Sequence, residues 1–108
     1  AALHQFIRIG DFSMIGGMAG ISRDLPPYCL ATRINRLAGL NLVGLRRAGF
    51  RPEQRKELKS AYAILFQQGL SRDASLAAAD NRDWSPAAQK LIEAVRHPSQ
   101  RGVLTRQA

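Results

Sequence analysis

The first 24 residues, AALHQFIRIGDFSMIGGMAGISRD, carry four aliphatic side chains spaced six apart: Leu3, Ile9, Ile15 and Ile21. A period of six fits neither an α-helix, which repeats every 3.6 residues, nor a simple strand, which repeats every two. It is typical of a parallel β-helix, in which each six-residue side of a coil turns one aliphatic residue inward. Such spacings can also arise by chance in a glycine- and methionine-rich loop. We predict short parallel strands over residues 3–24, with these four side chains inside.

One coil of a β-helix needs three sides, so residues 1–24 supply little more than a single coil. A single coil cannot bury its own aliphatic face, because solenoids need several stacked repeats for stability. The chain also begins within the pattern, at Ala1, and without an initiating methionine. We therefore expect it to be the carboxy-terminal piece of a longer chain.

The repeat region is predicted to end at Asp24-Leu25-Pro26-Pro27-Tyr28, which closes a first unit over residues 1–28. Two prolines cannot continue a hydrogen-bonded ladder, and they favour an extended exit. Residues 29–39 are predicted to be a connecting arm, and residues 40–108 a helical domain. The predicted fold class is β + α, the end of a parallel β-helix followed by a carboxy-terminal α-helical domain.

The sequence indicates four helices between residues 40 and 96, followed by a mostly polar tail docked through Val103 and Leu104. Pro52 suits the first position of the second helix, and Ser85-Pro86 suits the start of the fourth. Each of these two helices carries one apolar stripe at helical spacing. The stripes are Leu58, Ala61, Tyr62 and Leu65, and Ala88, Leu91, Ile92 and Val95.

The composition narrows the classes of function. Among 108 residues there is one cysteine, Cys29, and no apolar run near the roughly 20 residues that span a bilayer. A lone cysteine forms no internal disulfide, and no histidine–cysteine spacing resembles a zinc site. We therefore expect a cytoplasmic protein with no transmembrane segment, no metal and no cofactor.

The net charge of +8 is concentrated between residues 33 and 59. The basic residues there are Arg33, Arg36, Arg46, Arg47, Arg51, Arg55, Lys56 and Lys59, against Glu53 and Glu57. Such a patch suits nucleic acid, anionic headgroups, the phosphates of a nucleotide or an acidic protein, or it is a solvated face with no partner. No zinc-finger spacing, aromatic stacking set or helix-turn-helix pattern accompanies it, so we expect no nucleic-acid partner.

Several segments resemble the carboxy-terminal part of the UDP-N-acetylglucosamine O-acyltransferase family. They are His4-Gln5-Phe6, Ile9-Gly10, Ile15-Gly16-Gly17, Asp24-Leu25-Pro26-Pro27-Tyr28 and the stretch GLNLVGLRRAGF over 39–50. The resemblance covers essentially the whole chain and is strongest from 3 to 66. Many acyltransferases share the hexapeptide pattern, whereas the stretch over 39–50 is far more specific.

The resemblance implies a left-handed β-helix that forms a homotrimer, with active sites between subunits. The general rule for parallel crossovers predicts the opposite hand. The family transfers a 3-hydroxyacyl group from acyl carrier protein to the 3-hydroxyl of UDP-N-acetylglucosamine, the first step of lipid A biosynthesis. Its general base is a histidine of an earlier coil, so neither His4 nor His97 is assigned a catalytic role.

Five residues match substrate-binding positions of the family. His4 and Gln5 match a pair close to the donor and the nucleotide-sugar, and Gly17 matches the position that measures the acyl chain. Asn41 and Arg47 match the helical region over the cleft, where a guanidinium suits a diphosphate. Three of them have a structural alternative: a turn or core-edge histidine at 4, a glycine required by a tight coil at 17, and a helix cap at 41.

The arm departs from the family pattern. Residues 31–36 lack the Gly-Asn pair that is common there, and Ala48 follows Arg47 where some members carry another arginine. We therefore assign no nucleotide contact to residues 31–36.

Two other functions remain open. A hexapeptide acyltransferase acting on a different nucleotide-sugar keeps the fold and changes the acceptor. A non-catalytic trimerisation module instead uses its basic face to dock acyl carrier protein or an acidic membrane surface. The sequence upstream of this chain discriminates between the enzyme and the non-catalytic module: further hexapeptide coils that contain a histidine would favour the enzyme.

The resemblance also predicts that this 108-residue chain has no acyltransferase activity by itself. Loss of a general base typically removes about 10²–10⁴-fold of the rate, and loss of half the cleft removes more. An assay of the purified chain with a carrier-linked acyl donor and nucleotide-sugar checks this prediction. Turnover near that of the full-length enzyme, abolished by His4→Ala, contradicts it.

Overall fold

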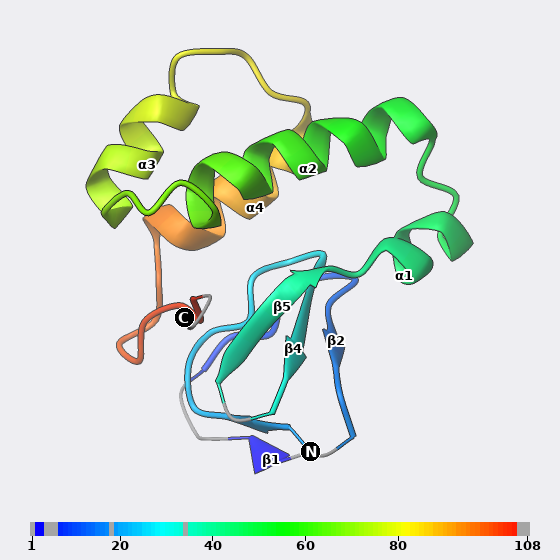
Figure 1. The fold of residues 1–108 in the computed structure, drawn as a ribbon, viewed down its shortest axis with the longest axis vertical. Helices are drawn as coiled ribbons and strands as arrows, with labels where there is room; N and C mark the ends of the chain where they lie inside the picture. The colour runs from blue at the N-terminus through cyan, green and yellow to red at the C-terminus, as the bar shows by residue number, and fades with distance from the viewer. Residues whose placement is uncertain (1, 4–6, 18, 34, 106–108) are drawn as a thin grey trace.

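The computed structural model describes residues 2–3, 7–17, 19–33 and 35–105. Its strands are β1 (Ala2–Leu3), β2 (Met14–Ile15), β3 (Gly20–Ile21), β4 (Cys29–Thr32) and β5 (Arg36–Leu40). Its helices are α1 (Leu42–Arg47), α2 (Pro52–Phe66), α3 (Arg72–Ala79) and α4 (Pro86–Arg96). Figure 1 shows α2, α3 and α4 gathered on one side of the strands, with α1 joining the two parts.

The amino-terminal strands form one coil with three parallel contacts. β1 pairs with β3, so that Leu3 lies beside Ile21. Ile9 forms a parallel bridge with Leu25, and β2 pairs with β4, which brings Ile15 beside Ala31. The predicted short parallel strands are therefore confirmed.

The coil does not keep a constant repeat. Leu3 and Ile21 are 18 residues apart, whereas Ile9 and Leu25 are 16 apart. Leu25 is 1% exposed, so it takes the inward position only four residues after Ile21. The side that leads into the two prolines is two residues shorter than a hexapeptide.

The prolines do not end the parallel pairing, contrary to the predicted end of the coil at residue 28. The backbone groups on either side of them make the ladder bonds: Leu25 O accepts from Gly10 N at 2.8 Å, and Tyr28 N donates to Asp11 O at 2.7 Å. Pro26 and Pro27 occupy the corner between these bonds, where no backbone donor is needed. The parallel pairing therefore continues beyond them to Leu30 and Ala31 of β4.

The inward orientation of the aliphatic residues is confirmed only in part. Ile21 is 3% exposed, and Ile15 is partly buried against the core. The prediction was wrong for Ile9, which is 42% exposed. Ile9 pairs with Leu25 on one side, and no other described strand pairs with Ile9. A complete solenoid buries such a residue between two coils. The side chain of Leu3 lies outside the described residues.

Residues 29–39, predicted to be a connecting arm, form a hairpin that extends to Leu40. β4 and β5 pair antiparallel, with Cys29 opposite Leu40 and Thr32 opposite Arg36. Asn35, in the turn, has a left-handed φ of 53°, and its side chain binds Ser22 in two ways. Its Oδ1 accepts from Ser22 N at 2.7 Å, and its Nδ2 donates to Ser22 Oγ at 2.6 Å. The hairpin turn is thus tied to the coil.

The helical region agrees with the sequence prediction. Pro52 begins α2, Pro86 begins α4, and both predicted stripes are buried. Ser71 caps α3 by accepting from Ala74 N at 3.1 Å. The stripes of α2 and α4 pack together beside α3, and the tail docks through Leu104, which is fully buried. Within the described ranges, no helix has both the length and the apolar character to cross a membrane.

Two glycines of the coil provide a test of its packing. A Cβ added at Gly10 lies 2.2 Å from Pro27 N, whereas one added at Gly17 meets nothing within 4 Å among the described residues. Gly10→Ala is therefore expected to lower the free energy of unfolding by about 1–3 kcal/mol, while Gly17→Ala changes it by less than about 0.5 kcal/mol. Urea unfolding of the two variants measures this difference. Equal effects contradict the close approach of the corner prolines to Gly10.

Candidate functional site

The junction of the strands and α1 contains a pocket of about 540 Å³, which we call the α1 pocket. Met14, Leu30 and Leu40 supply apolar walls from β2, β4 and β5. Asn41 and Arg47 supply polar groups from the two ends of α1. Two predicted site residues therefore come together beside an apolar surface.

Asn41 is held firmly at the edge of this pocket. It is the N-cap of α1, and its Oδ1 accepts from Gly44 N at 3.1 Å. Its Nδ2 donates to Phe12 O at 3.0 Å, and its backbone N donates to Tyr28 O at 2.6 Å. The helix-cap alternative is confirmed. One amide N–H and one oxygen lone pair remain for a ligand.

Arg47 is exposed in the last turn of α1. No carboxylate of the described residues lies within ion-pair distance of it. By contrast, Arg51 Nε lies 2.9 Å from Glu53 Oε1, and Arg55 Nη1 donates to Phe50 O. Arg47 is thus a guanidinium at a pocket without an internal anionic partner, which is the state an anion-binding residue needs.

The other predicted site residues are not part of this pocket. Gly17 lies in an exposed turn, outside the α1 pocket. It lacks a positive φ, and an added Cβ meets none of the described residues, so this chain itself does not require glycine there. His4 and Gln5 lie outside the described residues.

The basic residues of 33–59 do not form one patch. Arg33 and Arg36 lie at the turn end of the β4–β5 hairpin, whereas Arg46 and Arg47 lie on α1 beyond the other end of β5 (Figure 1). The remaining four belong to the start and first half of α2. The charge that is continuous in the sequence is therefore divided among the hairpin turn, α1 and α2.

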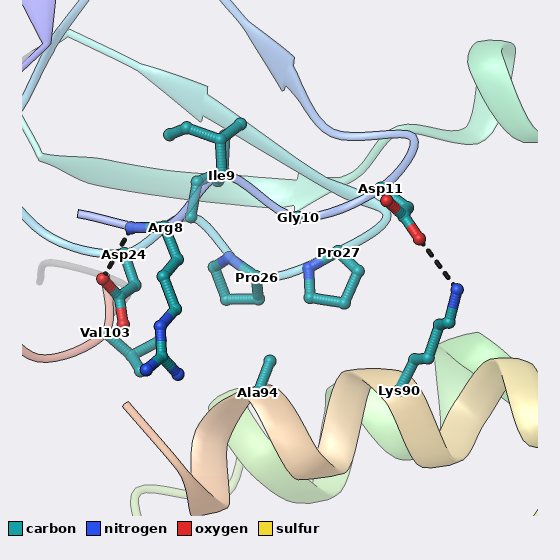
Figure 2. A pocket seen from close by; sticks show the side chains of 11 residues that line it. Arg8, Ile9, Gly10, Asp11, Asp24, Pro26, Pro27, Lys90, Ala94 and Val103 are labelled. Carbon is teal, nitrogen blue, oxygen red and sulfur yellow. Dashed lines mark hydrogen bonds and ion pairs between the residues drawn. The ribbon is translucent and has the colours of Figure 1, made fainter. Parts of the chain in front are cut away.

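A second cavity, of about 270 Å³, lies between the coil and α4. Figure 2 shows Asp11 reaching toward Lys90 across it, and their Oδ2 and Nζ atoms are 2.8 Å apart. At its other end Arg8 Nη1 donates to His97 O at 2.6 Å. The Asp11–Lys90 ion pair and the bond from Arg8 to the His97 carbonyl join the coil to the helical unit.

The buried ionisable groups of the coil are not arranged for catalysis. Burial raises the pKa of the Cys29 thiol well above its usual range, so the thiol stays protonated and a poor nucleophile. Burial also raises the pKa of Tyr28, Lys90 nearby lowers it, and Asp11 raises it. In the part of the chain that the structure describes, no group of three His, Cys, Asp or Glu residues could hold a metal ion.

Sequence reasoning missed the residues that shape the α1 pocket. Met14 is 51% exposed and Val43 58% exposed at this pocket, although both are apolar. Met14 precedes an inward Ile15 and so faces outward by alternation, which was a usable signal. Gly44 gave no signal, because its importance comes from the position of the Asn41 side chain.

The fold and the pocket define a class of protein domain. A parallel coil leads through a hairpin into a helical unit, and their junction presents beside apolar walls an amide and an arginine that pairs with no described carboxylate. The family model described as UDP N-acetylglucosamine O-acyltransferase, domain 2, matches residues 24–104. The chain therefore belongs to this family.

Two curated relatives of the chain carry one name, acyl-(acyl-carrier-protein)–UDP-N-acetylglucosamine O-acyltransferase. The protein from Burkholderia lata is 38% identical over 112 aligned residues, which cover 96% of this chain and 42% of the relative. The protein from a Sulfurovum species is 55% identical over 69 residues, covering 62% of this chain and 26% of the relative. The chain thus spans less than half the length of these curated relatives.

Solved structures give the same result. The UDP-N-acetylglucosamine acyltransferase of Bacteroides fragilis matches with a TM-score of 0.85 and 36% identity, over 94% of this chain and 40% of that one. The enzyme of Campylobacter jejuni matches with a TM-score of 0.84 and 30% identity, over 97% and 41%. The similarity covers both the coil and the helical unit.

Proposed function

We propose that this chain is the carboxy-terminal part of an acyltransferase that moves a 3-hydroxyacyl group from acyl carrier protein to the 3-hydroxyl of UDP-N-acetylglucosamine. Membership of the family over residues 24–104 supports this proposal, as do the names of the relatives. The observation that carries it is the α1 pocket, where Arg47 has no carboxylate partner among the described residues and lies with Asn41 beside apolar walls. Such a pocket suits a ligand that has both phosphates and less polar parts.

The residues of this chain bind and orient substrate in this proposal. Arg47 pairs with the diphosphate through charge-assisted hydrogen bonds, and the free half of the Asn41 amide contacts the nucleotide-sugar. His4 and Gln5 lie near the donor and the sugar, and Gly17 leaves space for the acyl chain. The base that removes the proton of the sugar hydroxyl comes from an earlier coil, so this chain supplies no catalytic residue.

We further propose a left-handed β-helix assembled as a homotrimer. The three parallel contacts of the coil support a solenoid that extends through repeats like this one. The exposed Met14 and Val43 at the α1 pocket support a neighbouring subunit over it, because exposed apolar groups around a polar site are typical of an interface. A cleft between subunits then closes the pocket.

The acyl donor is proposed to arrive on acyl carrier protein in the cytoplasm. Acyl carrier proteins are acidic, so the exposed basic residues Lys56 and Lys59 on α2 provide complementary charge. A reducing compartment also suits a chain whose one cysteine, Cys29, is a buried free thiol.

Arg47 and Arg51 form a matched pair for testing this function. Arg47→Ala in the full-length enzyme is expected to weaken nucleotide-sugar binding by about 1.5–3 kcal/mol, or about ten- to a hundredfold, because charge-assisted hydrogen bonds to phosphate are lost. Arg51→Ala is expected to do much less, because the Arg51 side chain is 70% exposed and is paired with Glu53. Steady-state kinetics with the nucleotide-sugar as the varied substrate compare them. Equal effects reduce the role of Arg47 to a general electrostatic field.

Gly17 tests the choice of acyl chain. Gly17→Leu in the full-length enzyme is expected to shift the preferred donor to a shorter chain, with use of the longest donor reduced about tenfold or more. The packing of this chain leaves room for the new side chain, so stability is expected to be unaffected. Values of kcat/KM for carrier-linked donors of several lengths measure the shift. A uniform loss for all donors contradicts the role.

A further inference from the structure

The orientation of α1 depends on its attachments. It has only six residues, too few for its own hydrogen bonds to keep it helical. At its carboxy-terminal end, Leu45 is fully buried, and its carbonyl accepts from Phe50 N at 3.0 Å. At its amino-terminal end, Asn41 bonds to Tyr28 and Phe12 of the coil. The direction in which Arg47 points is therefore set from outside the helix.

The contact with Phe12 involves an unusual backbone. Phe12 has a left-handed φ of 56°, which is rare for an aromatic residue. Its carbonyl oxygen accepts from Asn41 Nδ2, and its ring forms a cluster of three with Tyr28 and Phe50, at centroid distances of 6.1 and 5.3 Å from them. One asparagine side chain thus joins a strained turn of the coil to the start of α1.

Gly44 makes room for that side chain. A Cβ built on Gly44 lies 2.3 Å from Asn41 Nδ2 and 2.8 Å from Asn41 Cγ, which are distances that real Cβ atoms essentially never show. Gly44 has no positive φ that would require glycine. Inside a helix, glycine is also less favourable than alanine. The space taken by Asn41 therefore explains the glycine.

We propose that Gly44 is a positioning residue of the nucleotide-sugar site. It keeps Asn41 in place, and Asn41 in turn holds α1 at the angle that brings Arg47 to the pocket. This inference rests on the proposed function, because it assigns Arg47 to the diphosphate of a nucleotide-sugar. Any side chain at position 44 displaces the Asn41 amide and releases α1 from Phe12.

Four forms of the full-length enzyme test the inference: wild type, Gly44→Ala, Asn41→Ala and the double variant. Gly44→Ala is expected to raise the KM for the nucleotide-sugar about tenfold and to change kcat less than about threefold, because binding is lost and the base is untouched. In the Asn41→Ala background the same substitution is expected to change this KM less than about twofold. An effect that persists undiminished in that background shows that Gly44 does not act through Asn41.

Thermal unfolding of the same four forms gives a readout without substrate. Gly44→Ala is expected to lower the unfolding midpoint when Asn41 is present and to raise it when residue 41 is alanine, because alanine is then simply the better helix former. A change of the same sign in both backgrounds overturns the steric coupling. A fall in stability alone, with an unchanged KM, assigns Gly44 a structural role and overturns the positioning role.

The two proposals fail in different ways. If the wild-type enzyme acylates the nucleotide-sugar but the substitutions at positions 41 and 44 act independently, the proposed function stands and the inference is overturned. A wild-type enzyme that does not acylate the nucleotide-sugar overturns the proposed function and the substrate half of the inference. The unfolding cycle decides the contact between Gly44 and Asn41 in either case.

Discussion

A buried carboxylate holds the two parts of this molecule together. Asp24 is only 4% exposed, and its side chain accepts from Arg8 N at 2.9 Å and from both the N–H and the hydroxyl of Ser99. Its backbone also pairs with the tail, with Asp24 N donating to Gly102 O and Leu104 N donating to Asp24 O. Removing a partner from such a group leaves a buried polar atom unsatisfied, at a cost of about 1–3 kcal/mol.

This arrangement attaches the helical unit to the coil at both ends. The chain leaves the coil at Asn41, passes through the four helices and returns at Ser99. The ion pair between Asp11 and Lys90 adds a third connection along α4. The α1 pocket depends on this closure, because its walls come from the strands and its polar groups from α1. A rigid scaffold can thus present a helix that is too short to be stable alone.

Arginines that look alike in the sequence have different roles in the structure. Arg55 binds the carbonyl of Phe50, and Arg51 is paired with Glu53 at the start of α2. Arg47 has neither kind of partner within the described part of the chain, and it lines the pocket. A net charge of +8 therefore says little about binding until internal contacts are separated from available ones.

Local patterns in the sequence were enough to predict the helices and the short parallel strands, although not the β4–β5 hairpin. The spacing of Ile15 and Ile21 predicted short parallel strands, and Pro52 and Pro86 marked two helix starts correctly. The apolar stripes of α2 and α4 predicted their buried faces. These features follow from backbone geometry and periodicity, which act over a few residues at a time.

The tertiary structure alone decided how these elements meet. One side of the coil is shorter than six residues, so that Leu25 takes the inward position, and Ile9 is exposed. The tertiary structure also brought Asn41 beside Phe12, 29 residues earlier in the chain, and filled the space over Gly44. No periodicity encodes such contacts, because they depend on the packing of distant segments. The sequence therefore determined which residues form helices and strands, while packing determined that Asn41 and Arg47 share one pocket.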